Sequence, residues 1–108
     1  MPTLRNFCYH DLVIYGNDGE IIRTIPSEGS IRANRTVERF EVDGVPCAEI
    51  RFDGVVLPEI AEDEYFVVSR KVLEAIGGHP QLLCPDTSPE SAVRDQRGTI
   101  IGVRRLRR

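Results

Sequence analysis

The sequence lacks the long hydrophobic runs that mark membrane and secreted proteins. Among its 108 residues, no stretch approaches the roughly 18 apolar residues that a membrane-spanning helix requires. The first residues, up to Phe7, contain no hydrophobic segment of the kind that directs secretion. We therefore expect a cytoplasmic protein with no membrane partner.

Cysteine pairs and metal-ligand clusters are also scarce. The three cysteines, Cys8, Cys47 and Cys84, are odd in number and far apart in the sequence. This spacing predicts neither a disulfide framework nor a C-x-x-C motif, so we expect reduced, mostly buried thiols. Cys8 and His10 form one close pair of potential ligands, whereas zinc sites usually use two such pairs. We expect no metal and no cofactor.

Motifs for common catalytic chemistry are missing as well. The sequence contains no G-x-S-x-G nucleophile elbow, no Walker loop and no G-x-G-x-x-G motif. Cys47 lies in the middle of an expected strand, and Cys84 precedes a proline, so neither has a helix N-terminus to lower the pKa of its thiol. Binding is therefore favoured over catalysis. A small hydrolase or other acid–base enzyme around His10 and Asp11 stays open as the alternative.

Lysine is nearly absent, because Lys71 is the only lysine among the fourteen basic residues. Any anion site would therefore use mainly arginine, whose planar guanidinium group makes bidentate contacts. The charges are unevenly spread: residues 94–108 hold six arginines and one aspartate, while the remainder carries eight basic and sixteen acidic residues. Such a basic end can dock on the acidic body of its own chain or of a second copy.

Two hairpins are predicted in the first half of the chain. Asp11–Tyr15 and Ile21–Ile25 are rich in β-branched residues and flank a turn of asparagine, aspartate and glycine. Residues 35–42 and 45–52 alternate in polarity, so that Phe40 and Val42 share one face, and Asp43–Gly44 between them is typical of a two-residue turn.

A strand, a short helix and a second strand are predicted next. Tyr65–Ser69 is a continuous apolar run typical of a buried strand, and Ser69 can cap the helix expected over Arg70–Ile76. Two glycines and a proline end that helix, and Gln81–Cys84 is the expected return strand. These segments predict a compact β-α-β unit.

The closing segment, Val93–Leu106, is predicted to be a hairpin rather than a tail for nucleic acid. Asp95 and Gly98 supply turn chemistry, and an apolar β-prone run follows them. Only Arg104–Arg108 could hang free. The whole chain, 1–108, is thus predicted to be a single small α+β domain dominated by antiparallel β-hairpins, with one short helix.

Several motifs resemble a family of small uncharacterised proteins of phages, prophages and archaeal viruses. That family typically shows an asparagine followed by TPH, a proline-serine-glycine turn with a later arginine, LPEP, YIVS, a short helix, VPG or VPD, and a closing VRD-x-x-G-x-IIG-x-R-x-L. The corresponding segments here are Asn6 with Cys8–His10, Ile25–Gly29 with Arg32, Leu57–Ile60, Tyr65–Ser69, Cys84–Asp86 and Val93–Leu106. The sequence departs from the family at Cys8–Tyr9.

The resemblance implies an accessory protein of a virus or mobile element, acting in the host cytoplasm, that could inhibit host defence. The missing catalytic motifs and the arginines described below favour non-enzymatic binding of a small anionic ligand, such as a nucleotide-like signal, or of a host protein. A minor structural or assembly protein of the virion is a further alternative. Because hairpin-rich domains leave sheet edges open, we also expect a homo-oligomer.

The candidate ligand-binding residues are Arg32, Arg35, Arg94, His10 and Asp11. The arginines lie at expected loop edges, where binding residues concentrate, and a guanidinium clamp suits phosphate or carboxylate. The competing interpretation is internal ion pairing, for example of Arg94 with Asp86 or Asp95. The acidic run Glu59–Glu64 is expected to be a solvated loop or, alternatively, a patch for a basic partner.

Overall fold

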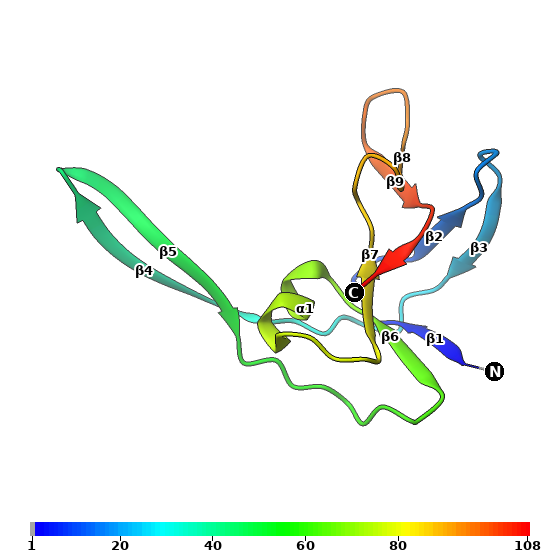
Figure 1. Ribbon diagram of the computed structural model, residues 1–108, viewed down its shortest axis with the longest axis horizontal. Helices are drawn as coiled ribbons and strands as arrows, with labels where there is room; N and C mark the ends of the chain where they lie inside the picture. The colour runs from blue at the N-terminus through cyan, green and yellow to red at the C-terminus, as the bar shows by residue number, and fades with distance from the viewer. Residues whose placement is uncertain (1) are drawn as a thin grey trace.

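The computed structural model describes residues 2–108, so the first residue of the expected domain lies outside the described residues. Ten strands and one helix are arranged as two small sheets and a projecting hairpin (Figure 1). The elements are β1 (Thr3–Asn6), β2 (Leu12–Tyr15), β3 (Ile21–Ile25), β4 (Asn34–Val42), β5 (Val45–Asp53), β6 (Glu64–Val67), α1 (Arg70–Ile76), β7 (Leu82–Pro85), β8 (Ala92–Arg94), β9 (Ile100–Val103) and β10 (Leu106–Arg107).

The first sheet contains the β-α-β unit, in the order β1-β6-β7-β10. β6 and β7 are parallel and are connected through α1, as the sequence predicts. The Ser69 side chain accepts a hydrogen bond from the backbone N–H of Val72, and the left-handed conformation of Gly77 ends the helix. The predicted cap and stop signals are therefore confirmed. β1, which the sequence analysis did not predict, runs parallel to β6.

The second sheet joins the two predicted hairpins of the body, in the order β3-β2-β9-β8. β2 pairs with β3 and β8 pairs with β9, both in antiparallel fashion. A short parallel contact between Ile14 and Val103 connects the hairpins. The closing segment is thus a structured hairpin, and the predicted α+β class is confirmed.

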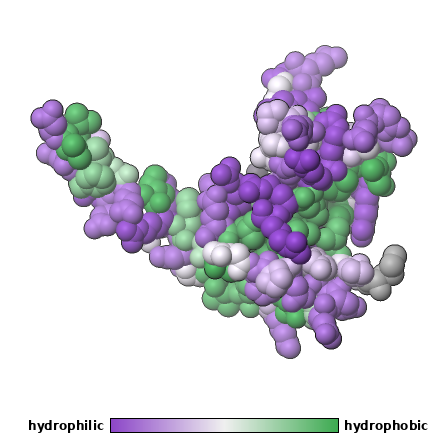
Figure 2. All heavy atoms as spheres, in the orientation of Figure 1, coloured by the Kyte–Doolittle hydropathy of each residue, from purple (hydrophilic) through white to green (hydrophobic). Residues whose placement is uncertain are grey.

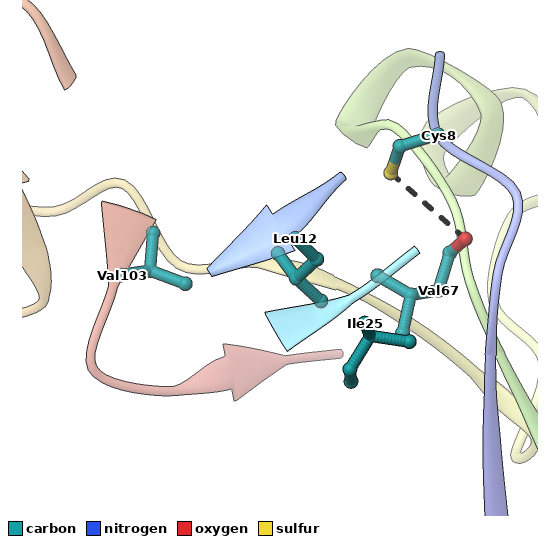
Figure 3. Close-up of a cluster of buried hydrophobic side chains, with 5 residues drawn as sticks. All are labelled: Cys8, Leu12, Ile25, Val67 and Val103. Atoms are coloured by element: carbon teal, nitrogen blue, oxygen red, sulfur yellow. Dashed lines mark hydrogen bonds between the residues drawn. The ribbon is translucent and has the colours of Figure 1, made fainter. Parts of the chain in front are cut away.

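The continuous apolar run at β6 is explained by burial on both of its faces. Phe66 packs with Val68, Val72 and Leu82 beneath α1. Val67 points the opposite way, because successive strand residues alternate in direction. Val67 belongs to a second hydrophobic cluster, which joins both sheets. This cluster consists of Cys8, Leu12, Ile25, Val67 and Val103 (Figure 3).

The last residues, Arg104–Arg108, which the sequence allowed to hang free, are held by the body of the chain. Leu106 and Arg107 form β10, which pairs with β7. The Arg105 side chain binds the carboxylates of Asp86 and Glu90, at 2.5 and 3.2 Å. The short final strand escaped sequence analysis because its stabilising contacts come from residues about twenty positions earlier. The basic end therefore docks on its own chain.

β4 and β5 form the predicted hairpin with paired residues Val42 and Val45 beside the turn. This hairpin, here called the arm (residues 34–53), extends away from the rest of the molecule (Figure 1). Phe40 and Val42 do share a face, but both are about half exposed, at 50% and 56%. The alternating pattern therefore predicted correctly that these residues share a face, but the rest of the chain does not cover that face.

Candidate functional site

Two clefts lie on either side of the turn that connects β1 to β2. The first has a volume of about 430 Å³ and the second about 240 Å³. Both are bordered by Cys8, Tyr9 and Ser69, so the clefts adjoin. This places Tyr9 between two recesses, at a position where one ligand can contact both.

The turn between the clefts is held by the fully buried side chain of Asn6. Its Nδ2 donates to the carbonyl oxygens of His10 and Ile25, each at 3.0 Å. Its Oδ1 accepts from the backbone N–H of Cys8 at 2.9 Å. One side chain thus fixes both ends of the turn and ties it to β3, which sets the position of Tyr9.

Tyr9 and His10 project from this turn as a pair of rings. The ring centroids are 4.7 Å apart and the planes meet at 83°, an edge-to-face arrangement. The side chain of Tyr9 is among the most exposed large hydrophobic groups, with 78% of the residue accessible. An exposed aromatic ring beside a cleft offers a surface on which a planar ligand can stack.

The geometry of His10 and Asp11 does not favour the hydrolase alternative. His10 Nδ1 donates to the backbone carbonyl of Asp11 at 2.8 Å, since a carbonyl can only accept. The Asp11 carboxylate instead accepts from the backbone N–H of Ser27 at 2.9 Å. Cys8 is a poor nucleophile, because burial raises the pKa of its thiol to about 11.

The second cleft combines aromatic rings with two cations. Phe7 and Phe52 line it together with Arg32 and Lys71. Arg32 Nε donates to Ser30 Oγ at 3.2 Å, which leaves the terminal nitrogens of the guanidinium group available. The Lys71 ammonium lies 5.3 Å from the centroid of the Phe52 ring.

The charge balance makes the second cleft the better anion site. Within residues 2–108, neither Arg32 nor Lys71 forms an ion pair with a carboxylate. Arg70, which borders the first cleft, is already bound to Glu74 at 2.8 Å. Two cations without a carboxylate partner, next to an exposed Tyr9, form the candidate site.

The structure does not bring all five predicted residues together. His10 and Asp11 border the first cleft, and Arg32 borders the second. Arg35 lies on β4 in the arm, opposite Phe52. Arg94 lies on β8, where its Nη1 donates to the carbonyl of Gly98 at 2.6 Å.

The suggested ion pairs of Arg94 are wrong, since Arg94 forms no ion pair within residues 2–108. Asp86 binds Arg105, and the Asp95 side chain accepts from the backbone N–H groups of Arg97 and Thr99. Sequence analysis also missed Tyr9 and Lys71 as site residues. Neither residue lies in a motif of known binding chemistry, so the sequence offered no signal for them.

Comparison of the chain with models of known protein families, with curated proteins and with solved structures gives no match. Among residues 2–108 there is no helix long and apolar enough to cross a membrane. The same residues contain no group of three or more histidine, cysteine, aspartate or glutamate side chains that could share a metal ion.

Proposed function

We propose that this chain binds a small anionic, nucleotide-like ligand across the two clefts beside Tyr9. The observation that carries the proposal is the pair of cations, Arg32 and Lys71, in an aromatic cleft without a carboxylate partner among residues 2–108. A phosphate group would bind these cations through charge-assisted hydrogen bonds. The neighbouring Tyr9 ring would stack on a base.

The volume and lining of the first cleft support a ligand with an apolar or planar part. About 430 Å³ falls within the range of roughly 300–1,000 Å³ typical of small-molecule sites. Its walls include Leu12, Val13, Ile100 and Ile101, with His10 at the edge. Because the Nδ1 of His10 is used by a carbonyl, Nε2 would be the ring atom that contacts the ligand.

The biological setting that we propose is that of a virus-associated accessory protein in the host cytoplasm. The resemblance to proteins of phages and archaeal viruses supports this setting. In such a protein, binding a nucleotide-like signal without turning it over would withdraw the signal from host defence. We also propose that the chain forms homo-oligomers, and the exposed apolar side chains of the arm support this part of the proposal.

A thermal-shift screen tests the ligand proposal. Purified protein is heated with a panel of nucleoside mono-, di- and triphosphates, cyclic nucleotides and inorganic phosphate. We expect at least one nucleotide to raise Tm, and we expect Tyr9→Ala to reduce the shift by removing the stacking surface. A panel without any shift, confirmed by equilibrium dialysis, would contradict the proposal.

A further inference from the structure

Two neighbouring hydrogen-bond acceptors lie at the edge of the first cleft. His10 and Asp11 both line this cleft, and both residues are exposed. The Nδ1 atom of His10 donates to the backbone carbonyl of Asp11 at 2.8 Å, so in the neutral ring Nε2 is left as an acceptor. The Asp11 carboxylate also accepts and cannot donate. This edge therefore suits a ligand group that carries hydrogen-bond donors.

The structural role of Asp11 uses only one of its two side-chain oxygens. Oδ1 accepts from the backbone N–H of Ser27 at 2.9 Å, which ties the residue before β2 to the segment after β3. Within residues 2–108, Oδ2 has no hydrogen-bond partner and the carboxylate forms no ion pair. A carboxylate offers about four lone-pair sites. Asp11 can therefore hold Ser27 and accept from a ligand at the same time.

The other walls of the first cleft suit a flat, largely apolar ring. The exposed ring of Tyr9 borders this space. Apolar side chains come from β2 and β9, namely Leu12, Val13, Ile101 and Val103. Figure 2 shows hydrophobic side chains gathered in the middle of the body, with hydrophilic ones around them. In a site with apolar walls, the few polar groups decide which ligand is bound, and here these groups include His10 and Asp11.

The common bases differ in the donors that their edges present. Guanine places two donors side by side, N1–H and the 2-amino group. In adenine and cytosine the amino group lies next to a ring nitrogen that accepts, and uracil has a single donor between two carbonyl groups. Guanine can therefore form two parallel hydrogen bonds with a carboxylate, whereas each of the other bases would turn an acceptor toward it.

We infer that the base of the ligand is guanine and that the Asp11 carboxylate accepts from its N1–H and 2-amino groups. The inference rests on the proposed binding of a nucleotide-like ligand beside Tyr9. It adds base recognition at the first cleft to phosphate binding by Arg32 and Lys71 at the second. The hydroxyl of Thr87, which also lines the first cleft, can donate to the carbonyl oxygen of the same base.

Isothermal titration calorimetry with matched pairs of nucleotides tests the inference. Guanosine and inosine phosphates, namely GMP with IMP, GDP with IDP and GTP with ITP, differ only in the 2-amino group. Loss of one hydrogen bond to a charged acceptor should weaken binding by about tenfold or more, so a guanosine phosphate should bind more tightly than its inosine partner by that factor. This comparison uses the unaltered chain and does not depend on the folding of any variant.

Asp11→Asn changes the free atom of the carboxylate and keeps the bonded one. The amide oxygen can still accept from the N–H of Ser27, while the NH2 group in place of the second oxygen donates and cannot accept. We expect the guanosine phosphate to lose about tenfold or more in affinity, and its preference over the inosine partner to fall to within about threefold. Asp18→Asn removes the same charge in the turn between β2 and β3, outside both clefts, and should leave the preference unchanged.

The outcomes separate base recognition from ligand binding itself. If no nucleotide binds, the proposed function fails and the inference fails with it. If guanosine and inosine phosphates bind equally well, or an adenosine or uridine phosphate binds most tightly, the inference is overturned while the proposed function stands. A guanine preference that Asp11→Asn retains in full overturns the assignment to Asp11. The Tm of each variant, measured without ligand, shows that the fold is retained.

Discussion

Arg105 binds Asp86 through its Nε, which donates to Oδ2 at 2.5 Å. The pair joins the last turn of the chain to the loop that follows β7. The hydrogen bond from Arg105 is the largest cause of a lowered pKa at Asp86, and Ser88 adds to it; the pKa of this carboxyl is about 2 instead of 3.8. The end of the chain is thus held by a carboxylate that must stay ionised.

This contact predicts a specific dependence of stability on acid pH. A lowered pKa means that the folded chain binds the proton less readily than the unfolded chain, so the contact stabilises the fold above about pH 4. Its contribution disappears as the pH falls toward 2. Arg105→Ala should lower Tm at pH 7 and should flatten the loss of Tm between pH 4 and 2.

Differential scanning calorimetry across this pH range measures the effect. Arg97→Ala, in the exposed turn between β8 and β9, is the control and should follow the wild-type curve. An Arg105→Ala curve parallel to the wild-type curve between pH 4 and 2 would refute the assignment.

The buried amide of Asn6 is predicted to hold both the fold and the site. Asn6→Ala removes three hydrogen bonds and leaves the N–H of Cys8 and the carbonyl groups of His10 and Ile25 without this partner. Leaving a buried polar group unsatisfied costs about 1–3 kcal/mol, so we expect at least that loss in the free energy of unfolding. Urea denaturation measures it.

Asn6→Asp separates the two kinds of contact. The carboxylate can still accept from Cys8 N–H but cannot donate to the two carbonyl groups. We expect this variant to be destabilised as well, and we expect new chemical shifts for the ring protons of Tyr9. Unchanged stability in both Asn6 variants would show that the turn does not depend on this side chain.

Local chemistry allowed much of this fold to be predicted from the sequence. The Asp43–Gly44 turn and the cap at Ser69 depend on contacts over a few residues. The hairpin of β4 and β5 and the helix α1 could therefore be located from residues that are close in the sequence. β10 could not, because its two residues are stabilised by β7 and by the Arg105–Asp86 pair. The alternating pattern of the arm could not predict that the arm is exposed. Alternation shows which side chains share a face, but it does not show what covers that face.

The site was only partly predictable for the same reason. Arg32 could be singled out because it follows a turn rich in proline and glycine. Lys71 is nearly forty residues away in the sequence, and only the packing of α1 against the base of the arm brings it into the same cleft. Arg94 satisfied the same loop-edge rule as Arg32, yet it bonds within its own hairpin.

Gly102 marks a close approach between β9 and β2 that tolerates no larger residue. A Cβ atom at this position would lie 2.7 Å from the carbonyl oxygen of Val13 and would overlap the ring of Tyr15. Overpacking of this kind costs about 1–3 kcal/mol, so Gly102→Ala should lower the free energy of unfolding by that amount. Ile101→Ala, next to it and 44% exposed, is the control for urea denaturation. Equal stability of the wild type and Gly102→Ala would contradict the packing.

The three thiols are predicted to differ in reactivity. Burial raises the pKa of both Cys8 and Cys84, whereas Cys47 lies on the arm and is only half-buried. At pH 8 iodoacetamide should therefore modify Cys47 well before the other two. Mass spectrometry of the native protein should show one early adduct, and Cys47→Ser should remove it. Equal rates at all three cysteines would contradict the burial.

The raised pKa of Cys8 also has a consequence at alkaline pH. The folded chain holds the thiol proton more tightly than the unfolded chain, so the neutral thiol stabilises the fold below about pH 9. That contribution is lost as the pH rises toward 11. Cys8→Ala should therefore show a smaller fall in Tm between pH 9 and 11 than the wild type.

Calorimetric titration of Arg32 and Lys71 variants tests the central claim most directly. The probe is the nucleotide that gives the largest shift in the thermal screen. A charge-assisted hydrogen bond contributes about 1.5–3 kcal/mol, so Arg32→Ala and Lys71→Ala should each weaken binding by about tenfold or more, with Tm unchanged. Arg94→Ala, which lies outside both clefts, should bind like the wild type. Full affinity in both Arg32→Ala and Lys71→Ala would contradict the proposed site.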